Sequence, residues 1–133
     1  MNFTEHYQLN QWEGTDRVLR EDFNRDNRKI EEAFLSLPKI VLGSYTGTGG
    51  YRADQPNILE LPFQPKLLFV FGGVMRFITT YGEGTTNCSP TGHSDGTLYL
   101  TWAGNTLKWH TYNGDPHDQM NAEGEVYHYV VIG

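Results

Sequence analysis

The distribution of glycine constrains the fold of this chain more than any other feature. Residues 39–133 hold fourteen of the fifteen glycines and five of the six prolines, whereas residues 1–38 hold one glycine and half of the charged residues. Frequent glycine and proline are typical of short strands joined by turns. The sequence therefore predicts two parts: residues 1–38 form an arm and an oligomerising or attachment helix, and residues 39–133 form an all-β head domain.

A stripe of apolar residues predicts the helix within the first part. The stripe repeats at spacings of three and four residues and consists of Leu19, Phe23, Asn27 (or Asp26), Ile30, Phe34 and Leu37. We expect Thr15 or Asp16 to cap the start and Pro38 to end the helix.

So short a helix is marginally stable alone, which leaves two partners open. It packs either on its own β domain or on copies of itself in a short coiled coil, where Asn27 would set the register. An extended aromatic arm that docks on a neighbour is expected upstream, from Phe3, Tyr7, Leu9 and Trp12.

Alternating apolar residues predict six to eight short strands after Pro38. The expected strands are 39–47, 58–61, 66–71, 74–81, 97–102, 106–110 and 126–132. Residues 66–71 are apolar on both faces, which predicts a central strand buried on both sides. A tight turn at Gly104-Asn105 would pair Trp102 with Leu107 and Leu100 with Trp109. The predicted fold class is mainly β, a β-sandwich or jelly-roll-like domain preceded by a short helix.

Charge and composition bear on the partners. The formal net charge is -6, and both nucleic acid and anionic membranes reward a basic surface, so we expect neither as a partner. No apolar run approaches the ~20 residues of a membrane span. A lone Cys88 cannot form an internal disulfide, which favours synthesis in a reducing cytoplasm.

No catalytic motif is present, and we expect no enzyme activity, cofactor or metal. Thr46 to Gly50 is glycine-rich but no helix follows it, so a turn is favoured over a phosphate site. His93 and Asp95 in one loop and Asp115, His117 and Asp118 in another could gather as metal ligands, but solvated loops are favoured.

Three loops are the candidate recognition sites. They are residues 48–57, 82–96 and 112–119, and the second is long enough to suggest function. Tyrosine, asparagine, aspartate and arginine on loops are typical of carbohydrate or protein recognition. The candidate ligand-binding residues are Tyr51, Arg52, Asp54, His93, Asp95, Tyr112, Asn113 and Asp115.

Two stretches resemble tail-fibre and baseplate-appendage proteins of phages and prophages of Gram-positive gut bacteria. The first runs from Tyr7-Gln8-Leu9-Asn10-Gln11-Trp12-Glu13-Gly14-Thr15-Asp16 through Arg20-Glu21-Asp22-Phe23-Asn24 to Lys29-Ile30. The second, looser match comprises residues 43–50, 61–70 and 127–133.

The resemblance implies a homotrimeric virion appendage for host attachment. Its helices would bundle at the proximal end through Leu19, Phe23, Asn27, Ile30 and Phe34, and arm residues such as Trp12 would anchor to other tail or baseplate proteins. The head loops would face the host surface and its cell-wall glycan, although no binding residue transfers by motif. The chain lacks the long shaft of such fibres. A purely structural tail component and a free lectin-like carbohydrate-binding module are the alternatives.

Overall fold

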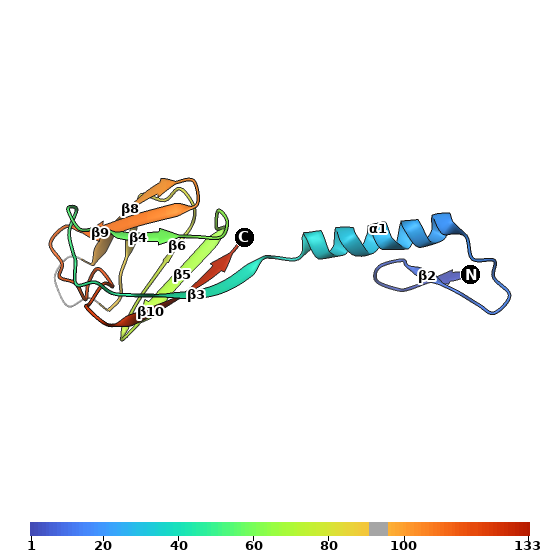
Figure 1. Cartoon of the computed structure of the whole chain (residues 1–133), viewed down its shortest axis with the longest axis horizontal. Coiled ribbons are helices and arrows are strands. Elements are labelled where there is room, and N and C mark those ends of the chain that lie inside the picture. The colour runs from blue at the N-terminus through green and yellow to red at the C-terminus, as the bar shows by residue number, and fades with distance from the viewer. Residues whose placement is uncertain (91–95) are drawn as a thin grey trace. The chain divides into compact units, whose positions relative to one another are not determined.

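The computed structural model describes residues 1–90 and 96–133 and divides into two compact units, Met1–Pro38 and Lys39–Gly133 (Figure 1). Within the part of the chain that the structure describes, no helix is both long and apolar enough to cross a membrane.

The N-terminal unit is a small hairpin packed on a helix. Strands β1 (Asn2–Phe3) and β2 (Asn10–Gln11) pair antiparallel, and α1 spans Arg20–Ser36. The Trp12 ring stacks on Phe23 with centroids 6.0 Å apart, and the Asn10 side-chain amide donates to the Asp26 carboxylate at 3.0 Å. The prediction of an extended arm is therefore wrong, because these contacts fold the arm onto its own helix.

The helix starts later than the sequence indicated. Leu19 occupies the N-cap position without a side-chain hydrogen bond. The Asp16 carboxylate instead accepts from the Glu13 backbone N–H at 2.8 Å and lies 3.4 Å from the N-terminal ammonium. Neither Thr15 nor Asp16 caps α1. The Asp16 carboxylate is instead hydrogen-bonded within the turn at residues 13–16. The predicted end is confirmed: α1 stops at Ser36, and Leu37 is extended before Pro38.

The C-terminal unit is a β-sandwich of two four-stranded antiparallel sheets (Figure 1). The first sheet has the order β3-β10-β5-β6, and the second has the order β4-β9-β8-β7. The strands are β3 (Ile40–Thr46), β4 (Asn57–Glu60), β5 (Leu67–Gly72), β6 (Met75–Thr79), β7 (Thr85–Asn87), β8 (Thr97–Ala103), β9 (Thr106–Thr111) and β10 (Val126–Ile132). The chain crosses from one sheet to the other in the β3–β4, β4–β5, β6–β7 and β9–β10 connections.

The predicted hairpin register is confirmed. Trp102 pairs with Leu107 and Leu100 with Trp109 across β8 and β9, around a turn in which Gly104 has φ +58°. Strand β10 also has its predicted bounds. Strand β7 was missed, because residues 82–96 were interpreted as a loop without strands. Its sequence, Thr-Thr-Asn, carries no apolar alternation.

The core lies between the two sheets and centres on Trp109. The Trp109 ring makes edge contacts with Phe77 of the first sheet, at 5.3 Å between centroids, and with Tyr45, at 5.7 Å. Leu68, Leu98, Leu107 and Val131 are fully buried around it. Aromatic residues thus join the inner faces of both sheets.

Strand β5 corrects a further expectation. It is central, between β10 and β6, but it is buried on one face only. Leu68 and Val70 point into the core, whereas Leu67 and Phe69 are half-buried and Phe71 is exposed. Within residues 39–90 and 96–133, no second layer covers the outer side of β5.

Candidate functional site

A single buried glutamine joins two of the loops that cross between the sheets, β3–β4 and β9–β10. The Gln119 side-chain oxygen accepts from the backbone N–H groups of Arg52 at 2.7 Å and Thr111 at 3.0 Å. Its amide nitrogen donates to the Gln55 carbonyl at 2.9 Å and to the Asn57 side-chain oxygen at 3.0 Å. Gln119 is completely buried. A satisfied buried network of this kind holds its members in one arrangement.

Asn121 fastens the same two loops a second time. Its side-chain oxygen accepts from the Thr48 N–H at 3.0 Å, and its amide nitrogen donates to the Thr48 hydroxyl and the Gly50 carbonyl, each at 2.9 Å. Below it, the Trp109 indole donates to the Gln119 carbonyl at 2.8 Å. The loops 48–56 and 112–125 are therefore anchored directly on the core.

This anchoring brings five of the predicted ligand residues onto adjacent segments. Because Arg52 and Thr111 donate to the same oxygen, the Tyr51-Arg52 and Tyr112-Asn113 segments lie side by side. Tyr51, Arg52, Asp54, Tyr112 and Asn113 are all exposed. The Arg52 guanidinium lies over the Tyr51 ring, 5.3 Å from its centroid. Rigidly held tyrosine and arginine side chains can stack on a sugar ring and donate hydrogen bonds to its hydroxyls.

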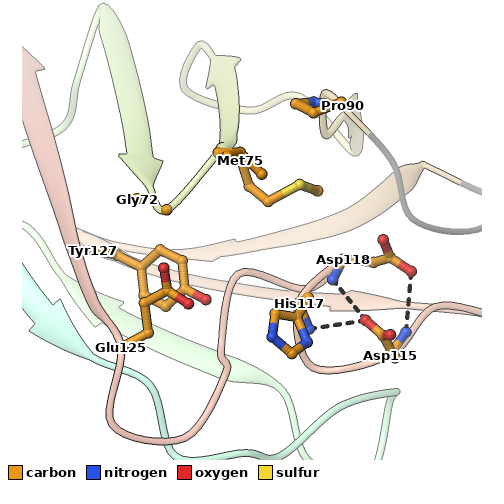
Figure 2. A pocket seen from close by; sticks show the side chains of 10 residues that line it. Gly72, Met75, Pro90, Asp115, His117, Asp118, Glu125 and Tyr127 are labelled. Carbon is orange, nitrogen blue, oxygen red and sulfur yellow. Dashed lines mark hydrogen bonds between the residues drawn. The ribbon is translucent and has the colours of Figure 1, made fainter.

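Asp115 has a different role from its neighbours. Its carboxylate accepts from the backbone N–H groups of His117 at 2.9 Å and Asp118 at 3.0 Å, and its own N–H donates to the Asp118 carboxylate at 3.3 Å (Figure 2). Asp115 therefore shapes the turn at residues 115–118.

That turn forms one wall of a pocket of about 400 Å³. Figure 2 shows the turn facing the end of β5, the start of β6, Tyr127 of β10 and Glu125, which precedes that strand. The other lining residues are Gly72, Gly73, Val74, Met75 and Pro90. The pocket is acidic along one side and apolar along the other.

The predicted His93 and Asp95 lie outside the described residues. Among residues 1–90 and 96–133, no group of three histidine, cysteine, aspartate or glutamate side chains is arranged to hold a metal ion. The described lining of the pocket in Figure 2 carries charge and hydrogen-bonding groups on Asp115, His117, Asp118 and Glu125.

Cys88 is a buried core residue whose thiol stays protonated at neutral pH. It is 1% exposed, and burial, assisted by the nearby Asp118 carboxylate, raises the pKa of its thiol to about 12. Burial likewise raises the pKa of Tyr127, whose hydroxyl accepts from the Ala122 N–H at 3.1 Å. A protonated, buried thiol is a poor nucleophile at neutral pH.

The predicted oligomerisation residues Phe23, Ile30 and Phe34 form an open apolar stripe on α1, with Leu19 at its N-cap and Asn27 within it. Leu19, Phe23, Ile30 and Phe34 are exposed by 44%, 52%, 40% and 69%, and Asn27 is also exposed. Within the N-terminal unit, the C-terminal part of the stripe borders an apolar groove of about 230 Å³, lined by Tyr7, Leu9, Ile30, Ala33, Phe34 and Leu37. The hairpin thus covers only part of the stripe.

Sequence reasoning missed the buried amides Asn57, Gln119 and Asn121. In the sequence they are ordinary polar loop residues, and no spacing marks them as buried. Glu125 and Tyr127 were not selected for the pocket, because Tyr127 lies in a plain strand pattern and Glu125 directly precedes it.

No protein-family model, curated protein or solved structure matches this chain.

Proposed function

We propose that this chain is a structural protein of a phage or prophage tail, assembled as a homotrimer, with the β-sandwich as a head that attaches to the host surface. The observation that carries the proposal is the exposed apolar stripe of α1. It lies on the same segment that resembles phage tail proteins.

The energetic argument concerns the stripe. Complete burial of a large apolar side chain is worth roughly 1.5–3 kcal/mol, and each of the four along the stripe still exposes about half of its surface, which costs roughly 1 kcal/mol each while it remains in water. Burial against the same stripe of other copies removes that cost, and the 17-residue helix is long enough for a short coiled coil. Asn27 within the stripe is a polar residue of the type that sets register and oligomer state.

Host attachment is assigned to the exposed residues of the two anchored loops. Tyr51, Arg52 and Tyr112 present rings and a guanidinium on a rigid base, which suits a cell-wall glycan. A purely structural tail component would share the oligomer and lack this binding.

A paired substitution tests the oligomer. Phe34→Lys places a charge on the stripe, and the control Leu35→Lys alters a residue that is 77% exposed and lies off the stripe. We expect Phe34→Lys to dissociate the trimer to 15.2 kDa and Leu35→Lys to leave its mass unchanged, both by light scattering after size exclusion. Equal masses for the two variants would contradict a helix-mediated trimer.

A second experiment tests attachment. The full chain, a Tyr51→Ala/Tyr112→Ala variant and the control Tyr99→Ala, from the outer face of the second sheet, are sedimented with purified Gram-positive cell walls. We expect loss of binding only for the loop variant. If none of the proteins binds the cell walls, the attachment role is wrong and the structural role is left. The presence of the chain in purified phage particles then tests the structural role.

A further inference from the structure

The two outer faces of the sandwich differ in chemistry. Antiparallel register places alternate residues of β3, β10, β5 and β6 on the outside of the first sheet. Nine of these are apolar: Ile40, Leu42, Leu67, Phe69, Phe71, Ile78, Val126, Val130 and Ile132. We call this set the apolar outer face. The other described positions on it are Ser44, Thr46, Arg76 and His128.

The side chains of this face form continuous rows. Leu42, Val130, Phe69 and Ile78 are directly opposite one another across the four strands. Phe71 stacks on Phe69, with ring centroids 5.2 Å apart, and its ring lies 5.6 Å from that of His128. Leu42 is 74% exposed, Ile40 59% and Ile78 54%. The face presents apolar area on the order of 500 Å², a size at which exposed patches mark interaction sites.

We propose that the apolar outer face is a second self-association surface, which packs against the same face of other copies in the trimer. This inference rests on the proposed function and extends it, since the trimer would then be held by the head as well as by the helix.

Charge supports a second copy as the occupant. The described positions of the face carry no carboxylate, although the chain has a net charge of -6. Copies can therefore meet there without burying an unpaired acid, which would be costly. Seven of the nine apolar side chains are aliphatic, and none of the nine offers a hydrogen bond to a sugar hydroxyl. A lone Arg76 is too little charge for an anionic membrane surface.

Covalent continuity with α1 supports the same occupant. A stable interface buries roughly 800 Å² per partner, more than this face alone provides. Only Leu37 and Pro38 separate the end of α1 from Lys39, whose backbone N–H and carbonyl pair with Gly133 in the first sheet. Association of the α1 stripes therefore holds the apolar outer faces of the copies at high effective concentration, so that a modest face suffices.

The experiment compares one isoleucine on each outer face. Ile78 on β6 and Ile58 on β4 are both on edge strands and are 54% and 61% exposed. The quantity measured is the protein concentration at which half of the trimer has dissociated. It is compared between the unaltered chain and each of the full-length variants Ile78→Lys and Ile58→Lys. Thermal unfolding verifies that both variants fold.

We expect Ile78→Lys to raise that concentration at least tenfold, and Ile58→Lys to change it less than twofold. If the unaltered chain is trimeric and the two variants dissociate at the same concentration, the apolar outer face is not an interface. The helix-mediated trimer would then still stand. An unaltered chain that is monomeric, as when α1 folds onto its own sheet, would overturn both. If Ile78→Lys fails to fold, Leu42→Lys replaces it, since Leu42 is the most exposed residue of the face.

Discussion

The two sheets of the head share a core but present opposite surfaces. On the inside, each contributes alternating large apolar residues, such as Phe77 and Val70 from one and Trp109 and Leu100 from the other. On the outside, the first sheet presents nine apolar residues, whereas only three of the eleven outer residues of the second sheet, Ile58, Tyr99 and Ala103, are apolar. The other eight are four threonines with Glu60, Asn87, Lys108 and His110. The inner faces account for folding, so the outer apolar residues of the first sheet require a different explanation.

The difference between the outer faces bears on how a stretch of sequence that is apolar on both faces of a strand is interpreted. Such a run normally predicts a strand between two layers. In residues 67–72 one side faces the core and the other is available for a partner. The pattern predicted burial on both faces, and an interface with a second copy would provide the second layer.

The largest expected effect comes from the core that both sheets share. Trp109→Ala removes the ring that contacts Tyr45 and Phe77, and we expect a loss of about 4 kcal/mol in the free energy of unfolding. Urea denaturation at one protein concentration, followed by near-UV circular dichroism, measures it. A loss below about 1 kcal/mol would mean that the sheets do not depend on a common core.

The next effect concerns the connection between the sheets. Gln119→Leu leaves the Arg52 and Thr111 N–H groups without their acceptor, and we expect a loss of about 2–3 kcal/mol. Asn113→Ala, an exposed change in the same loop, is the control and should stay within about 0.5 kcal/mol. The contrary result is equal stability of the two variants, which would mean that water replaces the glutamine at little cost.

Alkaline pH should weaken the core beside β7. Burial raises the pKa of the Cys88 thiol from its ordinary value of 9.0 to about 12. Between these values the unfolded chain loses this proton and the folded chain keeps it, so the free energy of unfolding falls as pH rises.

We expect this fall to reach about 1 kcal/mol at pH 10 relative to pH 8 from Cys88 alone. In the same comparison Cys88→Ala should lose less stability, retaining only the part due to tyrosines such as Tyr127, whose pKa is also raised. An identical pH dependence for the two proteins would refute the role of the thiol.

The smallest effect is expected on the polar outer face. Lys108→Ala and Glu60→Ala alter exposed side chains of the second sheet and should change the free energy of unfolding by no more than about 0.5 kcal/mol. Larger losses in urea denaturation would indicate that this face, too, packs against a partner, and the contrast between the faces would disappear.

Much of the head was predictable because its strands alternate clearly. The β8–β9 hairpin shows this best, since two tryptophans and two leucines fit a single register around Gly104. Strand β7 was not predictable, because its pairing is specified by its neighbours and not by its own three polar residues.

The candidate site was predictable only in its exposed parts. Tyr51, Arg52 and Tyr112 were selected by residue type, which indicates recognition chemistry. Gln119 and Asn121 were not, because burial of a polar side chain depends on partners that are distant in sequence. The arm was misjudged for the same reason: the contact between Trp12 and Phe23 is not indicated by any local spacing in the sequence.

The solution mass of the full chain, measured by light scattering after size exclusion at micromolar concentration, tests the central claim of self-association most directly. The α1 stripe and the apolar outer face together predict a trimer of three times 15.2 kDa, or about 46 kDa. A monomer of 15.2 kDa that persists as the concentration is raised would contradict the claim.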